Sequence, residues 1–315
     1  IKARNSRGEI ILVEIQQTRE LDYLQRMLYG VAKAVTEHIS SGQGYEHVKK
    51  VYSINIVYFN MGEGADYSGE SHSRVTLDLP ETQMSLLKDL ASLGKPVVLL
   101  NFAGRPTVMT WEKAHIPAIM NVWFGGTEMG PALCDVLFGD KSPSGHLTVS
   151  LPQHVGQEPL YYNHLNTGRP SGDYDATFRN YSSNYFEVSN GPAWPFGFGL
   201  SYTTFRYGDL QVEQSGRMVK ATVSLTNTGD REGTEVVQCY IRDIACRYSR
   251  PVKELKAFER VTLQKGETKS VTLTLDEKSL SYYDMQGRLF FEPGEFDIMV
   301  GSNCQDVQTK RITVN

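Results

Sequence analysis

Two nearly continuous apolar runs, KPVVLLNF at residues 95–102 and IPAIMNVWF at residues 116–124, decide the fold of the first part of this chain. Strands that are covered on both faces have this pattern, because neither face needs polar side chains. Amphipathic segments at residues 80–94 and 128–138 flank the two runs and predict helices. Alternating strands and helices predict a mainly parallel sheet with helices on its faces.

Residues that favour helix ends support these assignments. Pro80 stands at the start of the first predicted helix and Gly94 at its end. Thr127 is a good N-cap for the second helix, and Gly139 is a good C-terminal stop.

The same alternation extends upstream. Residues 9–15 (EIILVEI) and 53–60 (SINIVYFN) are apolar and predict strands, and residues 20–39 place their apolar side chains on one helical face. We therefore expect an α/β arrangement from near the start of the chain to about residue 151.

The second half has a different texture. Residues 152–204 are rich in Gly, Pro, Asn, Ser and aromatic residues, which predicts a packed connector without regular elements. Residues 220–243, 253–275 and 294–301 alternate apolar and polar side chains and are separated by turn signals such as NTGD and QKGE. This pattern predicts an antiparallel β-sandwich of immunoglobulin-like or fibronectin-like type over residues 205–315.

Composition excludes several classes of protein. The chain has 315 residues, 40% of them hydrophobic, and contains no apolar run long enough for a transmembrane helix, so no membrane partner is expected. No secretion signal is visible at the start. A net charge of -4 without a basic stripe argues against nucleic acid. The four cysteines lack zinc spacing and read as free thiols, although Cys239 and Cys246 could meet in an oxidising compartment.

An acidic, glycine-rich loop, NMGEGADYSGESHSR at residues 60–74, follows one predicted strand. A phosphate-binding role is disfavoured, because the loop lacks the full dinucleotide pattern and its carboxylates would repel a pyrophosphate. Metal-binding spacings are absent as well, although Glu63, Asp66, Glu70 and His72 are possible ligands. An ordinary surface turn remains open, but ligands bind at the carboxyl ends of parallel strands, which favours a catalytic role.

Several stretches together resemble one family. They are residues 69–83 (GESHSRVTLDLPETQ), 94–106 (GKPVVLLNFAGRP), 116–152, 161–170 (YYNHLNTGRP), 195–205 (PFGFGLSYTTF) and 250–268. In this order they resemble the C-terminal half of glycoside hydrolase family 3, the β-glucosidase and β-xylosidase family, from about residue 68 onward. The resemblance implies an α/β sandwich domain followed by a fibronectin-III-like domain, without the TIM barrel that precedes them in the family.

The resemblance also implies site residues. The family's general acid/base is a glutamate in a Gly-Glu-x-x-x-Arg context, which corresponds to Glu70, followed by Arg74. A retaining glycosidase pairs such an acid with a carboxylate nucleophile about 5 to 5.5 Å away, and a nearby ionised partner would raise the acid's pKa. We assign Arg74 to positioning the loop or to substrate contact, and neither a cofactor nor a metal is expected.

The family's nucleophile, an aspartate in a Ser-Asp-Trp context, and its sugar-binding Lys-His pair lie in the barrel. Neither motif occurs in these 315 residues. The resemblance therefore implies that a barrel from elsewhere is a partner, and that a β-glucoside or oligosaccharide is the substrate. It also implies a periplasmic or extracellular location.

Residues 1–67 resemble a different family, the PD-(D/E)xK nuclease-family transposases. The acid-x-Gln strand of that family corresponds to Glu14 and Gln16, which would help to hold a divalent metal. An ordinary strand-edge carboxylate is the simpler interpretation of Glu14. The expected organisation is thus a nuclease-like segment at 1–67, a partial α/β sandwich domain at 68–151, the connector at 152–204 and the β-sandwich.

Aromatic side chains are further candidates, because their faces stack on sugar rings. Trp194 is a candidate for substrate binding, whereas Trp123 lies in an apolar run and is expected in the core. His146 replaces the Lys or Arg that the family has more usually after Ser-Gly, and we expect a structural role. The leading hypothesis is the C-terminal portion of a retaining exo-β-glucosidase, and the alternative is a non-catalytic carbohydrate-binding or scaffold protein.

Overall fold

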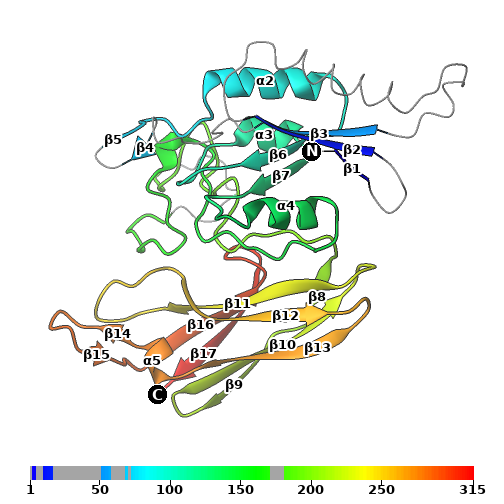
Figure 1. Cartoon of the computed structure of the whole chain (residues 1–315). Helices are drawn as coiled ribbons and strands as arrows, with labels where there is room; N and C mark the ends of the chain where they lie inside the picture. The colour runs from blue at the N-terminus through cyan, green and yellow to red at the C-terminus, as the bar shows by residue number, and fades with distance from the viewer. Residues whose placement is uncertain (1, 5–9, 17–50, 58–67, 70–71, 171–180) are drawn as a thin grey trace, which may run out of the picture.

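The computed structural model describes residues 2–4, 10–16, 51–57, 68–69, 72–170 and 181–315. An α/β part and a β-sandwich lie one above the other, and the connector runs between them (Figure 1).

The α/β part follows the predicted order of strands and helices. Strand β6 pairs in parallel with β7, so that Val98 faces Ala118 and Asn101 faces Asn121. A short helix between these two strands is not evident from the sequence pattern. The elements are α2 (Glu81–Ser92), β6 (Val98–Asn101), α3 (Thr110–His115), β7 (Ala118–Asn121) and α4 (Met129–Leu137).

The upstream strands form a separate sheet. Strand β2 (Ile10–Gln16) pairs in parallel with β3 (Val51–Val57) and antiparallel with β1 (Lys2–Arg4). The predicted parallel pairing is therefore present in two strand pairs, but the described residues do not join them into one sheet. The helix expected at 20–39 lies outside the described residues.

The helix ends agree with the predictions in three positions of four. Pro80 is the N-cap of α2, and the glycines after α2 and α4 have left-handed backbones, with φ of 62° at Gly94 and 81° at Gly139. The assignment of Thr127 as N-cap is wrong, because α4 begins one residue later and Glu128 occupies this position without a side-chain capping bond.

The described residues of the α/β part form a small core. Five buried side chains form it, and Trp111 and Trp194 pack against it while remaining partly exposed. The buried side chains are Leu87, Leu99, Met109, Ile116 and Leu151. Trp123 is not among them, so its prediction as a core residue is wrong: strand β7 ends at Asn121, and Trp123 follows with a left-handed φ of 58° and partial exposure.

The β-sandwich consists of two antiparallel sheets, as the period-two pattern predicts. One sheet has the order β13-β10-β8 with β9 also on β10, and the other has the order β12-β11-β16-β17. The strands are β8 (Phe205–Tyr207), β9 (Gln211–Ser215), β10 (Met218–Asn227), β11 (Gly233–Asp243), β12 (Glu254–Leu263), β13 (Thr268–Leu275), β16 (Gly294–Gly301) and β17 (Val307–Val314). Helix α5 (Glu277–Leu280) and the hairpin of β14 (Tyr282–Tyr283) and β15 (Leu289–Phe290) lie between β13 and β16.

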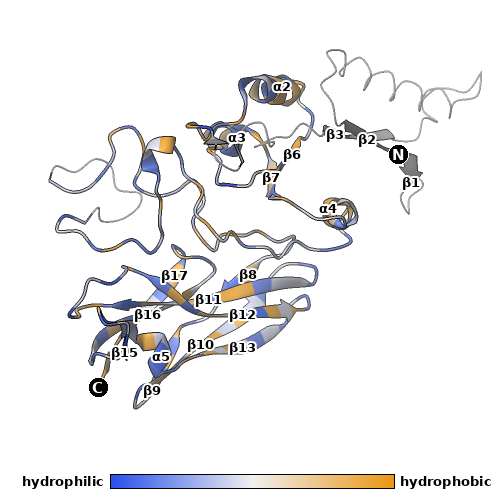
Figure 2. Cartoon of the chain, turned by 60° about the vertical axis from the view of Figure 1, so that its left-hand side comes forward, coloured by the Kyte–Doolittle hydropathy of each residue, from blue (hydrophilic) through white to orange (hydrophobic). Residues whose placement is uncertain are grey.

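Alternate side chains of these strands fill the core between the sheets. Along β10, Val219, Ala221, Val223 and Leu225 are buried and the residues between them are not. Hydrophobic and hydrophilic residues accordingly share the same strands in Figure 2. This alternation is what a sheet with one solvated face requires.

The two turn signals connect strands of different sheets. The NTGD turn follows β10 and leads to β11, and the QKGE turn follows β12 and leads to β13. Asn227 joins the two turns: its backbone accepts from Gly266 N, and its side-chain amide donates to Arg231 O and Leu263 O.

All four cysteines are free thiols, so Cys239 and Cys246 do not form a disulfide. In the part of the chain that the structure describes, no helix is long and apolar enough to span a membrane.

Candidate functional site

The segment that carries the predicted acid/base begins with two very short strands. Strand β4 (Ser68–Gly69) pairs antiparallel with β5 (His72–Ser73), with Gly69 opposite His72. In chain order, Glu70 and Ser71 connect these two strands, and both lie outside the described residues. Glu63 and Asp66, the competing carboxylates, also lie outside them.

Arg74 follows β5 directly and is half-buried. Its Nη1 donates to Asp78 O at 3.2 Å, and its Nη2 donates to Thr76 Oγ1 at 3.0 Å. These bonds fold the backbone after β5 onto the Arg74 side chain, and its role in positioning the loop or in substrate contact stays a prediction.

A second arginine reaches the same segment from the loop after β6. Arg105 Nη1 donates to Ser73 Oγ and to Arg74 O, each at 3.0 Å, and its Nη2 donates to Thr76 O at 3.1 Å. The sequence analysis did not single out Arg105. The only available signal was its place in the NFAGRP stretch, just after the carboxyl end of a predicted strand.

The backbones of the two segments are also joined. Asp78 and Val108 form a parallel bridge, and Val108 N donates to Leu77 O at 3.0 Å. Gly104 permits a close approach beside Arg105, because a Cβ there would lie 2.7 Å from Cε2 of Phe124.

Buried amides mark the carboxyl ends of the two parallel strands β6 and β7. Asn101 Nδ2 donates to Asn121 Oδ1 at 2.8 Å and to Thr107 Oγ1 at 3.0 Å. Asn101 Oδ1 and Asn121 Nδ2 are buried without a hydrogen-bond partner in the described structure. These amides hold the loop that follows β6, where ligands bind in open parallel sheets.

A buried carboxyl group, that of Glu112, follows the Asn101–Thr107 hydrogen bond by a few residues in the sequence. Glu112 in α3 is 1% exposed, and its Oε1 has no hydrogen-bond partner in the described structure. Burial raises the pKa of this carboxyl, a raise to which the nearby Asp78 adds. The protonated form of Glu112 is therefore favoured more than that of an exposed glutamate.

Trp194, the predicted sugar-stacking residue, is partly buried. Its backbone pairs with Leu151, and its ring borders the α/β core. The Lys113 ammonium lies 5.1 Å from the ring centroid, and Lys113 Nζ donates to Ala193 O at 2.5 Å. These contacts favour a packing role for Trp194.

His146 connects the α/β part to the sandwich. Its Nε2 lies 3.4 Å from Glu235 Oε1, and both side chains are largely buried. Tyr207 donates to the same carboxylate oxygen at 3.2 Å. Burial, and then the charge of Glu235, raise the pKa of Tyr207. The structural role expected of His146 agrees with this position.

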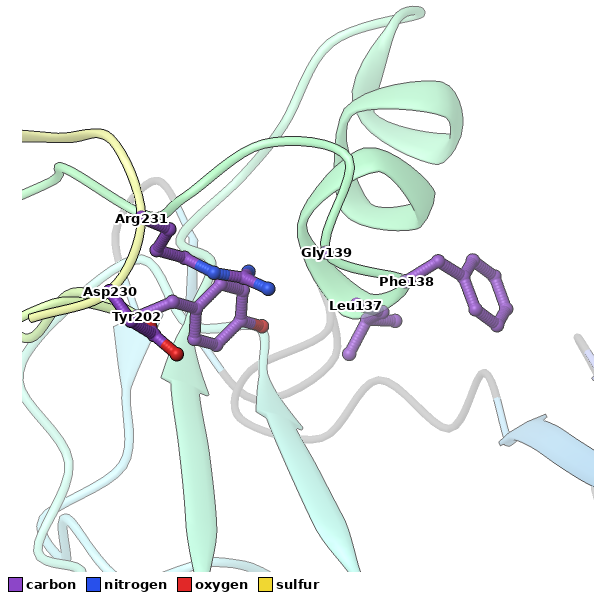
Figure 3. Close-up of a pocket in the computed structure, with 6 residues that line it drawn as sticks. All are labelled: Leu137, Phe138, Gly139, Tyr202, Asp230 and Arg231. Carbon is purple, nitrogen blue, oxygen red and sulfur yellow. The ribbon is translucent and has the colours of Figure 1, made fainter. Parts of the chain in front are cut away.

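A shallow hollow lies at another point of the same junction. Figure 3 shows Tyr202, Asp230 and Arg231 on one side and the end of α4 on the other, with the Phe138 ring pointing away from Tyr202. Tyr202 donates from its hydroxyl to Val136 O at 2.8 Å, and the Arg231 guanidinium lies 5.6 Å from the Tyr202 ring centroid. These contacts hold the junction together. Among the described residues, no group of His, Cys, Asp or Glu could hold a metal ion.

The arrangement defines a class of protein: an α/β domain with a motif-bearing hairpin, joined to a fibronectin-III-like sandwich. Comparison with known families agrees. The description "Glycosyl hydrolase family 3 C-terminal domain" matches residues 6–202, and "Fibronectin type III-like domain" matches residues 235–304. The chain belongs to glycoside hydrolase family 3.

Known relatives are glycoside hydrolases. The chain is 43% identical over 268 residues to a periplasmic β-glucosidase of Salmonella typhimurium, covering 84% of this chain and 35% of the relative. It is 35% identical over 311 residues to a β-xylosidase of Formosa agariphila, covering 93% of this chain and 42% of the relative. A crystal structure of a Listeria innocua β-glucosidase in complex with glucose superposes with a TM-score of 0.77 at 33% identity, covering 97% of this chain and 46% of that one.

The chain therefore spans between a third and a half of the length of these relatives. The family match begins at residue 6, much earlier than the limit near residue 68 that the motifs indicated. It covers nearly all of the segment expected to resemble a nuclease, and that second resemblance is not shown. Glu14 and Gln16 belong to strand β2, and the structure describes the backbone of this strand but not its side chains.

Proposed function

We propose that this chain is the C-terminal portion of a retaining exo-β-glucosidase and that Glu70 is its general acid/base. The observation that carries the proposal is the family match over residues 6–202, which includes the Gly-Glu-x-x-x-Arg motif at residues 69–74. The bonds of Arg74 and Arg105 support it, because they fix the backbone directly after this motif. Catalytic groups need such support to hold a productive geometry.

In the proposed mechanism, Glu70 first protonates the glycosidic oxygen as the leaving group departs. A carboxylate nucleophile attacks the anomeric carbon from the opposite face and forms a covalent glycosyl-enzyme. Glu70, now ionised, then removes a proton from the water that hydrolyses this intermediate. The substrate is a β-glucoside or oligosaccharide with a terminal non-reducing glucosyl residue.

The nucleophile would come from a TIM-barrel domain, since these 315 residues contain no Ser-Asp-Trp motif. Exposed apolar side chains support a partner on the α/β part. Val75, two residues from the end of β5, is 89% exposed, and Phe124, which approaches Gly104, is 68% exposed. Covering these side chains would favour association and would exclude water near the hairpin. The name of the Salmonella relative supports a periplasmic or extracellular location.

A chimera tests the acid/base assignment. The barrel of the Salmonella typhimurium relative is fused ahead of this chain, and hydrolysis of an aryl β-glucoside is measured for the parent, Glu70→Ala and Glu63→Ala. We expect Glu70→Ala to lose about 10²- to 10⁴-fold in kcat/KM, the usual contribution of a general acid/base. Glu63→Ala is the matched control, because it removes a carboxylate from the same loop.

The outcomes separate the hypotheses. Parent-like activity of Glu70→Ala would sink the acid/base assignment, and substantial turnover by the 315-residue chain alone would contradict the proposed source of the nucleophile. A chimera that binds glucosides without turning them over would favour the alternative, a non-catalytic carbohydrate-binding or scaffold protein.

A further inference from the structure

We propose that Arg105 is a positioning residue for Glu70, acting through the backbone of residues 73–76. This inference rests on the proposed function, because it concerns how that acid/base is held. Arg105 comes from a different strand end, 31 residues further along the chain from Arg74, so it ties the motif to the sheet.

The Arg105 guanidinium donates to three acceptors at once, which its shape allows. Its two terminal nitrogens donate to the Ser73 hydroxyl, the Arg74 carbonyl and the Thr76 carbonyl. A planar fork with donors in fixed directions can serve such spread acceptors together, whereas a lysine ammonium is a single point charge.

The segment that Arg105 holds, between β5 and Leu77, presents mostly exposed side chains. Ser73, Val75 and Thr76 are exposed, and Val75 has 89% of its surface accessible. Burial of apolar side chains therefore cannot fix the backbone between β5 and Leu77. Hydrogen bonds from Arg74 and Arg105 contribute to ordering it.

The loop that carries Arg105 has buried residues on both sides of the arginine. Ala103 is fully buried and Thr107 is 4% exposed, so buried residues lie on both sides of it in the chain. Thr107 accepts a hydrogen bond from Asn101, the last residue of β6. The loop that carries Arg105 is therefore tied to the end of β6 by burial and by this hydrogen bond.

The reaction makes this positioning measurable. Glu70 lies three residues before Ser73 in the chain, and under the proposal a shift of this backbone would be passed on to the acid. Displacement by about 1 Å can cost a factor of 10² in rate. Such a displacement lowers the rate of proton transfer to the leaving group. The loss is larger for a leaving group that needs protonation to depart.

The first experiment uses the 315-residue chain by itself. Hydrogen–deuterium exchange of the peptide spanning residues 68–79 is compared for the parent, Arg105→Gln, Arg105→Lys and Arg217→Gln. We expect about tenfold faster exchange of this peptide in Arg105→Gln and partial protection in Arg105→Lys, with the sandwich peptides unchanged. Arg217→Gln is the matched control, since Arg217 forms an exposed ion pair with Glu277 in the sandwich.

The second experiment uses the barrel chimera and two substrates. Phenyl β-glucoside needs proton donation to its leaving group, whereas 2,4-dinitrophenyl β-glucoside does not. We expect Arg105→Gln to lower kcat/KM about 10- to 100-fold on the phenyl glucoside and less than threefold for the dinitrophenyl one. In a Glu70→Ala background, Arg105→Gln should have no further effect on the phenyl glucoside, because the residue acts through Glu70.

Unchanged exchange of residues 68–79 in Arg105→Gln would overturn the proposal at once. Equal losses on both substrates, or a full additional loss in the Glu70→Ala background, would also overturn it. If Glu70→Ala itself affects both substrates equally, the proposed function fails, and the exchange result still decides whether Arg105 anchors the segment.

Discussion

The β-sandwich closes one continuous core between its two sheets, while the described residues of the α/β part bury a cluster of five apolar side chains. Partnerless buried polar atoms are distributed in the same uneven way. Within the described residues, all of them belong to the α/β part and the connector, among them Asn101 Oδ1, Glu112 Oε1 and Asn121 Nδ2. Buried polar groups without partners cost free energy, so they persist where another requirement is met. Within the described residues, the sandwich therefore satisfies its own buried polar side chains, whereas the α/β part does not.

The largest expected effect tests the self-sufficiency of the sandwich. Phe296 in β16 is fully buried and stacks on Phe291 with ring centroids 6.4 Å apart. Phe296→Ala should lower the free energy of unfolding by about 3 to 5 kcal/mol, because it removes contacts and leaves a cavity. Urea denaturation followed by circular dichroism measures this loss.

The control for this prediction is Phe258→Ala on strand β12, whose side chain is 63% exposed. It should change the free energy of unfolding by less than about 1 kcal/mol. Equal losses in the two variants would break the comparison, because core burial would then not explain the stability of the sandwich.

A smaller effect of opposite sign is expected in the α/β part. The raised pKa of Glu112 means that the folded chain binds this proton more tightly than the unfolded chain does. Its stability contribution is therefore fully present below the ordinary pKa near 4.5 and is lost as pH rises through the raised folded value. Glu112→Gln should stabilise the chain at pH 7 by on the order of 1 kcal/mol and flatten the pH dependence of stability.

Thermal or urea unfolding at pH 4, 5, 6 and 7 checks this prediction. Glu277→Gln is the control, since the Glu277 side chain is 55% exposed and pairs with Arg217 on the sandwich surface. A parent-like pH dependence of stability in Glu112→Gln would show that the buried carboxyl carries no such cost.

The smallest effect on stability should come from the exposed aromatic surface beside the hairpin. Phe124→Ser should change the free energy of unfolding by within about 0.5 kcal/mol, because the ring is 68% exposed. It should nevertheless weaken binding to a separately expressed family barrel by roughly tenfold, if that barrel covers the ring. Phe258→Ser is the matched control on the sandwich, and isothermal titration calorimetry measures both affinities. Equal affinities for the two variants would place the covering partner elsewhere.

Local patterns predicted the sandwich well, because the alternation of apolar and polar residues within each strand shows which side chains are buried. In β10 and β13, alternate residues are buried, as a period of two requires. The elements of the α/β part were harder to predict from the sequence. The apolar runs at 95–102 and 116–124 predict β6 and β7 correctly, but α3 lies between them without a long periodic pattern. Trp123 continues an apolar run in the sequence but leaves the strand, because its backbone turns left-handed.

The candidate site also contains residues that the sequence identifies and residues that only the fold identifies. Glu70 and Arg74 stand within one short motif, so the sequence can single them out. Arg105 cannot be found in this way, because its role depends on acceptors about thirty residues away. The role of Trp194 in sugar binding stays a prediction, and the fold adds only that its ring packs against the α/β core with the Lys113 ammonium beside it.

By itself, the sequence of this protein determined the order of its elements, its two domain types, its family and the motif around Glu70. These follow from periodicity, turn residues and short contiguous motifs, which depend on neighbours along the chain. Long-range contacts show which turns join the two sheets through Asn227, which histidine links the domains, and that Arg105 holds the backbone after the motif. Such contacts arise when the chain brings distant donors and acceptors within about 3 Å, and no local pattern encodes that distance.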